Sequence, residues 1–168
     1  TVGEEIGALP VPPAKADYRF DGWYDVDDNK ITETSTFEAS VVDINAKWVL
    51  QTVITFTAEG GTINGEATKS IDAGTAIGTL PTATIDVAGE AFGGWLTADG
   101  KLVDENTVFA ADVTAITLTA SFGWDGETVS ESLSGEGTEE APYLISSGAD
   151  LAYLASSVNG GNNYSGKY

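Results

Sequence analysis

Phe20-Asp21-Gly22-Trp23 decides the fold of this chain, because the pattern returns 72 positions later as Phe92-Gly93-Gly94-Trp95. The aromatic and apolar residues around each copy predict strands over residues 17–24 and 89–96. A glycine inside a strand indicates a bulge or a close backbone approach. Such a bulge could turn the following tryptophan inward, so both motifs are predicted to sit at the core of a β-structure.

Further matches extend outward from this motif in the same order, which indicates an internal repeat. Their offset drifts from 71 to 74, and the changes fall between motifs, where loops take insertions. We therefore predict two tandem copies, residues 1–49 and residues 50–123. The other matched segments are Gly3–Pro10 with Gly74–Pro81, Ile31 with Val103, Thr36-Phe37 with Val108-Phe109, and Ala46-Lys47-Trp48 with Ala120-Ser121-Phe122.

The second copy is the more complete one. It begins with Gln51–Thr57, in which Ile54 and Phe56 alternate with Val53 and Thr55, as expected of a strand. The first copy has no such strand before Gly3. Either the sequence begins inside a repeat, or its missing strand is supplied from elsewhere.

Closing strands and hairpin turns complete each copy. Residues 41–49 and 114–122 read as closing strands, the second with regular alternation of apolar and polar residues. Asp28-Asn29 and Asp99-Gly100 fall where hairpin turns belong.

The last segment, residues 124–168, differs from the repeats. An acidic linker rich in glycine and serine precedes a short apolar strand at Pro142–Ile145. A helix is predicted at about 147–159, with capping-box spacing from Ser147 to Asp150. Its apolar residues recur at helical spacing and need a partner, either the second repeat or further sequence. They are Leu151, Leu154, Ala155 and Val158.

Composition excludes many classes of site. The 168 residues contain no His, Cys or Met, so no Ser-His-Asp triad, thiolate site, haem ligation, usual zinc site or disulfide can form. The net charge of −19 is spread along the chain, which makes nucleic acid and anionic membrane surfaces poor partners. No stretch approaches the ~18 apolar residues of a membrane helix, so no membrane insertion is expected. No signal peptide is visible within the chain.

The motifs resemble the Listeria–Bacteroides repeat, also known as the B repeat of the internalin B type. The resemblance covers about residues 1–123, with F-x-G-W as its most specific element. Leu96 and Phe122 depart from the pattern that Tyr24 and Trp48 follow, and both keep apolar bulk. The resemblance implies small β-grasp-like modules strung in tandem on secreted or wall-anchored bacterial proteins, where they act as non-catalytic spacers.

The tail has a resemblance of its own. Residues 135–168 look like the entry segment of parallel β-helix regions in bacterial surface proteins. The expected fold is therefore mainly β (α+β): two tandem small β-grasp-like repeats, then a linker, a short strand and a short amphipathic helix. The first repeat, residues 1–49, is expected to lack its opening strand.

Aromatic residues are the candidate structural core, because a module of about 70 residues has little other bulk to bury. These residues are Phe20, Trp23, Trp48, Phe56, Phe92, Trp95 and Phe122. As an alternative, Trp23 and Trp95 could form a sugar-stacking platform.

Asp25, Asp27 and Asn29 place oxygen ligands at alternate positions, like the start of a calcium loop. Lys30 and Thr36 stand where such a loop needs glycine and glutamate, so these residues are weak metal candidates and a hairpin turn is the preferred interpretation. No catalytic motif and no cofactor site is expected, and carboxylate pairs lie in no recognisable motif.

The sequence thus favours a non-catalytic structural spacer of a secreted or cell-surface bacterial protein, an adhesin-like stalk located outside the cell. One alternative is a self-assembling surface fibre, in which an open sheet edge accepts a neighbour's strand. The other is a glycan-binding accessory module of a larger secreted protein. The partners expected are accordingly a protein or glycan at the cell surface.

Overall fold

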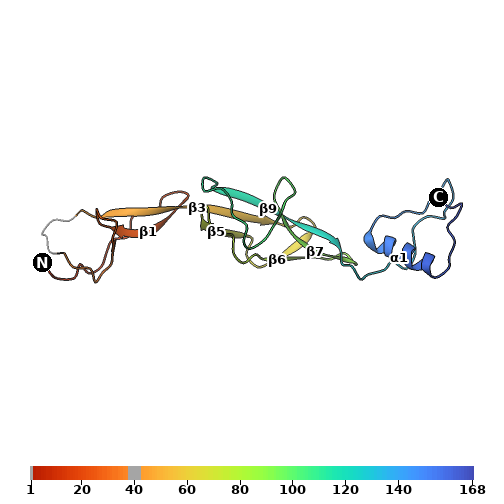
Figure 1. Cartoon of the computed structure of the whole chain (residues 1–168), viewed down its shortest axis with the longest axis horizontal. Helices are drawn as coiled ribbons and strands as arrows, with labels where there is room; N and C mark the ends of the chain where they lie inside the picture. The colour runs from red at the N-terminus through yellow and green to blue at the C-terminus, as the bar shows by residue number, and fades with distance from the viewer. Residues whose placement is uncertain (1, 38–42) are drawn as a thin grey trace. The chain divides into compact units, whose positions relative to one another are not determined.

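The computed structural model describes residues 2–37 and 43–168, and it is mainly β with one short helix, as predicted (Figure 1). The main sheet has the strand order β2-β1-β3-β9-β7-β8, with β5 also paired to β3, and β4 and β6 form a separate ribbon. The described elements are β1 (Tyr18–Tyr24), β2 (Lys30–Ile31), β3 (Asn45–Thr57), β4 (Gly61–Asn64), β5 (Thr68–Asp72), β6 (Thr82–Ile85), β7 (Glu90–Leu96), β8 (Leu102–Val103), β9 (Ala115–Trp124) and α1 (Gly148–Asn159).

The chain divides into two compact units that do not coincide with the two repeats. The first unit holds residues 1–55, 68–78 and 106–116, and the second holds residues 56–67, 79–105 and 117–168. Each repeat therefore contributes residues to the first unit.

Strand β3 runs across the predicted repeat boundary without interruption. The closing strand of the first repeat and the opening strand of the second form one strand of 13 residues. Val41 and Val42, the start of the predicted closing strand, lie outside the described residues. Even-numbered side chains are the more buried ones at both ends of β3: Ala46 is half-buried between exposed neighbours, and Ile54 and Phe56 are fully buried, whereas the four residues from Trp48 to Gln51 are all half-buried. One strand thus offers a single core-facing side to both repeats.

The bulges predicted from the glycines are present in both repeats. The antiparallel pairing of β1 with β3 shifts register between Phe20 and Gly22, and that of β7 with β9 shifts between Phe92 and Gly94. Gly22 has φ +150° and Gly94 has φ +124°, a backbone conformation that residues with a Cβ rarely adopt. The bulges place the two tryptophans in equivalent registers, opposite alanines of the partner strands. These pairs are Trp23 with Ala46 and Trp95 with Ala120.

Hairpin turns close both repeats where predicted. In the first repeat the turn joins β1 to β2, and the Asp25 N–H donates to the Asn29 carbonyl oxygen at 3.0 Å. In the second repeat the turn joins β7 to β8, and the Thr97 N–H donates to the Lys101 carbonyl oxygen at 2.9 Å. The two repeats therefore share their bulge, their hairpin and their strand register.

The C-terminal segment contains the helix but not the short strand expected at Pro142–Ile145. The structure has a single bridge there, between Ser134 and Leu144. Proline has no N–H to extend such a pairing, and Gly135 at φ +96° leaves the extended conformation. Helix α1 begins at Gly148 with Ser147 as its N-cap, and both hydrogen bonds of the capping box to Asp150 are formed.

Candidate functional site

Four aromatic side chains form the core of the second repeat. Trp95 is only 1% exposed, and its ring centroid lies 4.8 Å from that of Phe56 and 5.3 Å from that of Phe92. Phe122 extends the group, at 6.2 Å from Phe92. The Trp95 indole N–H donates to the Pro81 carbonyl oxygen at 2.7 Å, which satisfies its only polar atom. With its faces covered, Trp95 offers no surface on which a sugar could stack.

Three aromatic side chains form the equivalent group in the first repeat. Phe20 lies 5.7 Å from Trp23 and 5.5 Å from Trp48, with edge-to-face geometry in both pairs. The Trp23 indole N–H donates to the Pro10 carbonyl oxygen at 2.8 Å, which matches the bond from Trp95 to Pro81. Trp23 is nevertheless only half-buried. The first repeat has no counterpart of Phe56 among the described residues.

Other positions show the same loss of burial in the first repeat. Leu118 is 0% exposed, whereas Ile44, its counterpart at the offset of 74, is only half-buried. Ile77 is 1% exposed, whereas its counterpart Ile6 is half-buried. Positions close to the bulge are unaffected, since Ile31 and Val103 are each 6% exposed. The first repeat thus keeps the hairpin part of its core and leaves the rest partly open.

A polar network joins β1 of the first repeat to Asp72 of β5, and it uses positions of β1 that are small or apolar in β7. Arg19 binds Asp72 through two nitrogens, at 3.1 and 2.9 Å, and reaches Asp21 at 3.0 Å. The Tyr24 hydroxyl donates to the other oxygen of Asp21 at 2.5 Å. The corresponding residues of the second repeat are Ala91, Gly93 and Leu96.

These contacts shift the acid–base equilibria of the network. The hydrogen bond from Tyr24, followed by that from Arg19, holds the pKa of Asp21 below its ordinary value of 3.8. Arg19 likewise lowers the pKa of Asp72, and Asp21 raises that of Tyr24. The network therefore favours ionised carboxylates and acts as an exposed structural clamp between β1 and β5. Sequence reasoning missed it, because a single Arg–Asp pair 53 positions apart leaves no local pattern.

The three weak metal candidates lie in the turn between β1 and β2. The Asp25 carboxylate accepts hydrogen bonds from the backbone N–H of Asp27 at 3.0 Å and of Asn29 at 2.8 Å, and from the Asn29 amide at 3.0 Å. The Asn29 side-chain bond is the main cause of the lowered pKa of Asp25. The Asp25 carboxylate oxygens thus already accept hydrogen bonds within the turn. Among the described residues, no group of three His, Cys, Asp or Glu side chains could hold a metal ion.

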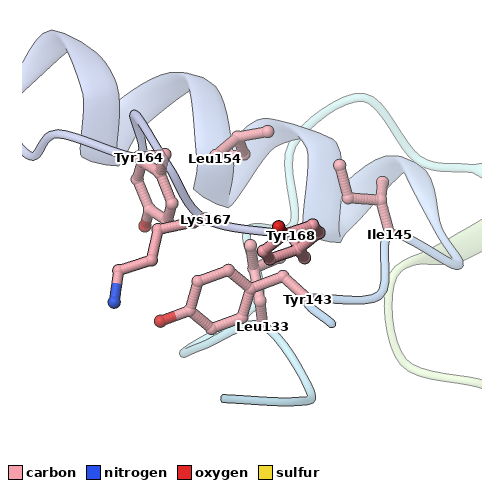
Figure 2. Close-up of a pocket in the computed structure, with 7 residues that line it drawn as sticks. All are labelled: Leu133, Tyr143, Ile145, Leu154, Tyr164, Lys167 and Tyr168. Atoms are coloured by element: carbon pink, nitrogen blue, oxygen red, sulfur yellow. The ribbon is translucent and has the colours of Figure 1, made fainter. Parts of the chain in front are cut away.

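An apolar hollow lies in the C-terminal segment beside α1 (Figure 2). The rings of Tyr143 and Tyr164 meet edge to face at 5.7 Å, and the Lys167 ammonium extends away from the helix. The predicted helix face is only partly covered here: Leu154 lines the hollow, while Leu151 and Val158 are 57% and 49% exposed. The lining residues are Leu133, Tyr143, Ile145, Leu154, Tyr164, Lys167 and Tyr168. In the part of the chain that the structure describes, no helix is long and apolar enough to cross a membrane.

Comparison with known proteins identifies the family. The family model of the Listeria-Bacteroides repeat domain matches residues 1–47 and 53–121, one match for each of the two copies. No curated protein and no solved structure matches the chain. The matched residues cover more than half of the sequence and include both F-x-G-W motifs. The chain therefore belongs to the Listeria-Bacteroides repeat domain family.

Proposed function

We propose that this chain is a non-catalytic structural spacer of a secreted or cell-surface bacterial protein, part of an adhesin-like stalk. The observation that supports it best is the continuity of β3, which joins the two repeats as one strand of 13 residues with no linker between them. A strand of that length spans about 43 Å at ~3.3 Å per residue. Hydrogen bonds to β1, β9 and β5 hold this strand along its length.

The test is the distance distribution between labels in the two repeats. The chain has no cysteine, so Asp27→Cys and Ala98→Cys give unique spin labels on exposed hairpin turns of the first and second repeat. Double electron–electron resonance is expected to give one narrow distance. The matched control inserts four Gly/Ser residues between Leu50 and Gln51: the even number keeps the alternation of core-facing side chains in each repeat, while the flexible insert should broaden the distance distribution. An equally broad distribution in the uninterrupted chain would contradict the spacer function.

A surface fibre that assembles by strand complementation is the second candidate. The partly open core of the first repeat favours it, because Trp23, Ile44 and Ile6 are all less buried than their counterparts. Light scattering after size exclusion, with electron microscopy of the same fraction, tests it. A monomer at all concentrations would contradict a self-assembling fibre and leave the spacer function intact.

A glycan-binding module receives less support. Trp95 is buried and Trp23 is held by Phe20 and Pro10, so the two do not form an exposed aromatic row. The tail is proposed to lead into a β-helix region of the same surface protein. That proposal accounts for the exposed apolar residues of α1, Leu151 and Val158.

A further inference from the structure

We infer that the Asn64–Gly65 peptide is a site of spontaneous deamidation, and that the isoaspartate formed there weakens the hydrogen bond between Pro81 and Trp95. The reaction takes place in the second repeat, at the end of the ribbon of β4 and β6. Water is its only co-reactant. This modification site goes beyond the spacer function and does not depend on it.

An asparagine followed by glycine is the sequence in which this reaction is least hindered. The backbone nitrogen of the next residue attacks the carbonyl carbon of the asparagine side chain, and glycine has no Cβ to obstruct the approach. Two of the seven asparagines precede glycine, Asn64 and Asn159. The other five precede residues with side chains. The sequence therefore favours these two places over the others.

The structure distinguishes between the two. Asn159 ends α1, and the Gly160 N–H donates to the Ser156 carbonyl oxygen at 2.9 Å, so its nitrogen is held by the helix. Asn64 ends β4, and the N–H of Gly65 donates no hydrogen bond to any group in residues 2–37 and 43–168. The Asn64 side chain is exposed and is likewise bonded to none of these residues. Asn64 thus combines a free side-chain amide with a free attacking nitrogen.

The reaction needs no catalyst and balances with water alone. The Gly65 nitrogen loses its proton to water or hydroxide and bonds to Asn64 Cγ. The bond from Cγ to Nδ2 breaks, and the side-chain nitrogen takes up a proton and leaves as ammonia. Water then opens the cyclic imide at one of its two carbonyl carbons. One opening gives aspartate, and the other gives isoaspartate, in which the main chain runs through the former side chain.

The site adjoins the support of the buried tryptophan. Asn64 pairs with Thr82 in the register of β4 with β6, and the preceding Pro81 accepts the Trp95 indole N–H at 2.7 Å. Gly65 lies against the same proline, since a Cβ added to it would be 3.2 Å from Pro81 Cβ. Isoaspartate lengthens the main chain by one methylene, which disturbs the pairing with Thr82. The modification therefore reaches the second-repeat core through Pro81.

The first experiment incubates the folded chain in mildly alkaline buffer and follows deamidation by tryptic digestion and mass spectrometry. Cleavage after Lys47 and Lys69 leaves Asn64 as the only asparagine of its fragment. Asn64 is expected to react at least about tenfold faster than Asn159, because attack by Gly160 must first break its hydrogen bond. In denaturant the two rates should become similar, because that hydrogen bond is lost. Asn64→Gln is the matched control and should abolish conversion at this position, because its longer side chain must close a larger ring.

The second experiment tests the effect on the core. The isoaspartate form, separated by chromatography, is compared with Asn64→Asp, which has the new charge but a main chain of normal length. Amide exchange in β6 and exchange of the Trp95 indole N–H should be about tenfold faster or more in the isoaspartate form. Both should stay close to those of the unmodified chain in Asn64→Asp. Reaction of Asn64 no faster than that of Asn159 in the folded chain would overturn the proposal. So would an isoaspartate form whose Trp95 and β6 exchange rates are unchanged.

Discussion

The two repeats share one design, but only the second completes its core. Both have the bulge, the hairpin, the tryptophan bonded to a proline carbonyl, and the same strand register. In the second repeat Phe56 covers Trp95, whereas no residue described in the first repeat corresponds to Phe56, and Trp23 is half-buried. The first repeat instead has an ionic network from Arg19 to Asp21 and Asp72. A repeat can thus keep its backbone architecture while its apolar core is partly open, with polar contacts around it.

The largest expected effect comes from removing each tryptophan. Trp95→Ala should cost about 3–5 kcal/mol and unfold the second repeat, because it deletes the centre of a four-ring core. Trp23→Ala should cost less, about 1–3 kcal/mol, since the side chain is already partly in water. Chemical denaturation, with amide exchange resolved by strand, measures both. Equal costs would mean that the first-repeat core is as complete as the second.

The two bulge glycines are expected to have equal effects, each smaller than that of Trp95→Ala. Gly22→Ala and Gly94→Ala each force a side chain into a positive-φ conformation, which costs about 1–3 kcal/mol. The added Cβ would also lie 2.7 Å from Lys30 Cε in the first case and 2.6 Å from Leu102 Cδ1 in the second. Gly123→Ala is the matched control, since it has a negative φ and open space around it. A clearly lower melting temperature for only one of the two bulge variants would show that the bulges are not equivalent.

Lowering the pH should increase the difference in stability between β1 and β7. Asp21 and Asp72 have folded-state pKa values below 3.8, so they stabilise the fold above that pH, and this contribution is lost as the pH falls through the folded-state values. Strand β1, which carries Asp21 and is bound through Arg19 to Asp72 of β5, should therefore lose protection below about pH 4 more steeply than β7, which has no such ion pair among the described residues. Amide exchange in β1 and β7 between pH 6 and pH 2 measures this. The double variant Asp21→Asn, Asp72→Asn should reduce the dependence of amide exchange in β1 on pH. An unchanged dependence would exclude the network as its source.

The smallest effect is expected from calcium. The Asp25 oxygens already accept the N–H groups of their own turn, so millimolar Ca²⁺ should give no heat in calorimetric titration. Measurable heat that disappears in Asp27→Ala would establish a site that exists only in the first repeat, since the second has Ala98-Asp99-Gly100 in its turn.

Most of the architecture could be predicted because it is encoded locally. The spacing of Phe20, Gly22 and Trp23 gives a strand with a bulge, and Ser147 with Asp150 gives a helix start. The parts that were missed depend on distant partners. Pro142–Ile145 has the composition of a strand, but pairing there stops at one bridge to Ser134. The clamp from Arg19 to Asp72 and the fusion of two predicted strands into β3 also depend on which segments meet in space.

The continuity of β3 has a consequence for how such a protein can change in length. Its even-numbered side chains face the core on both sides of the repeat boundary, from Trp48 to Ile54 and Phe56. Inserting one residue between Leu50 and Gln51 would reverse that parity and turn Ile54 and Phe56 toward solvent. Inserting two would restore it. Insertions or deletions between the two repeats are therefore expected to keep these side chains in the core only when they add or remove an even number of residues.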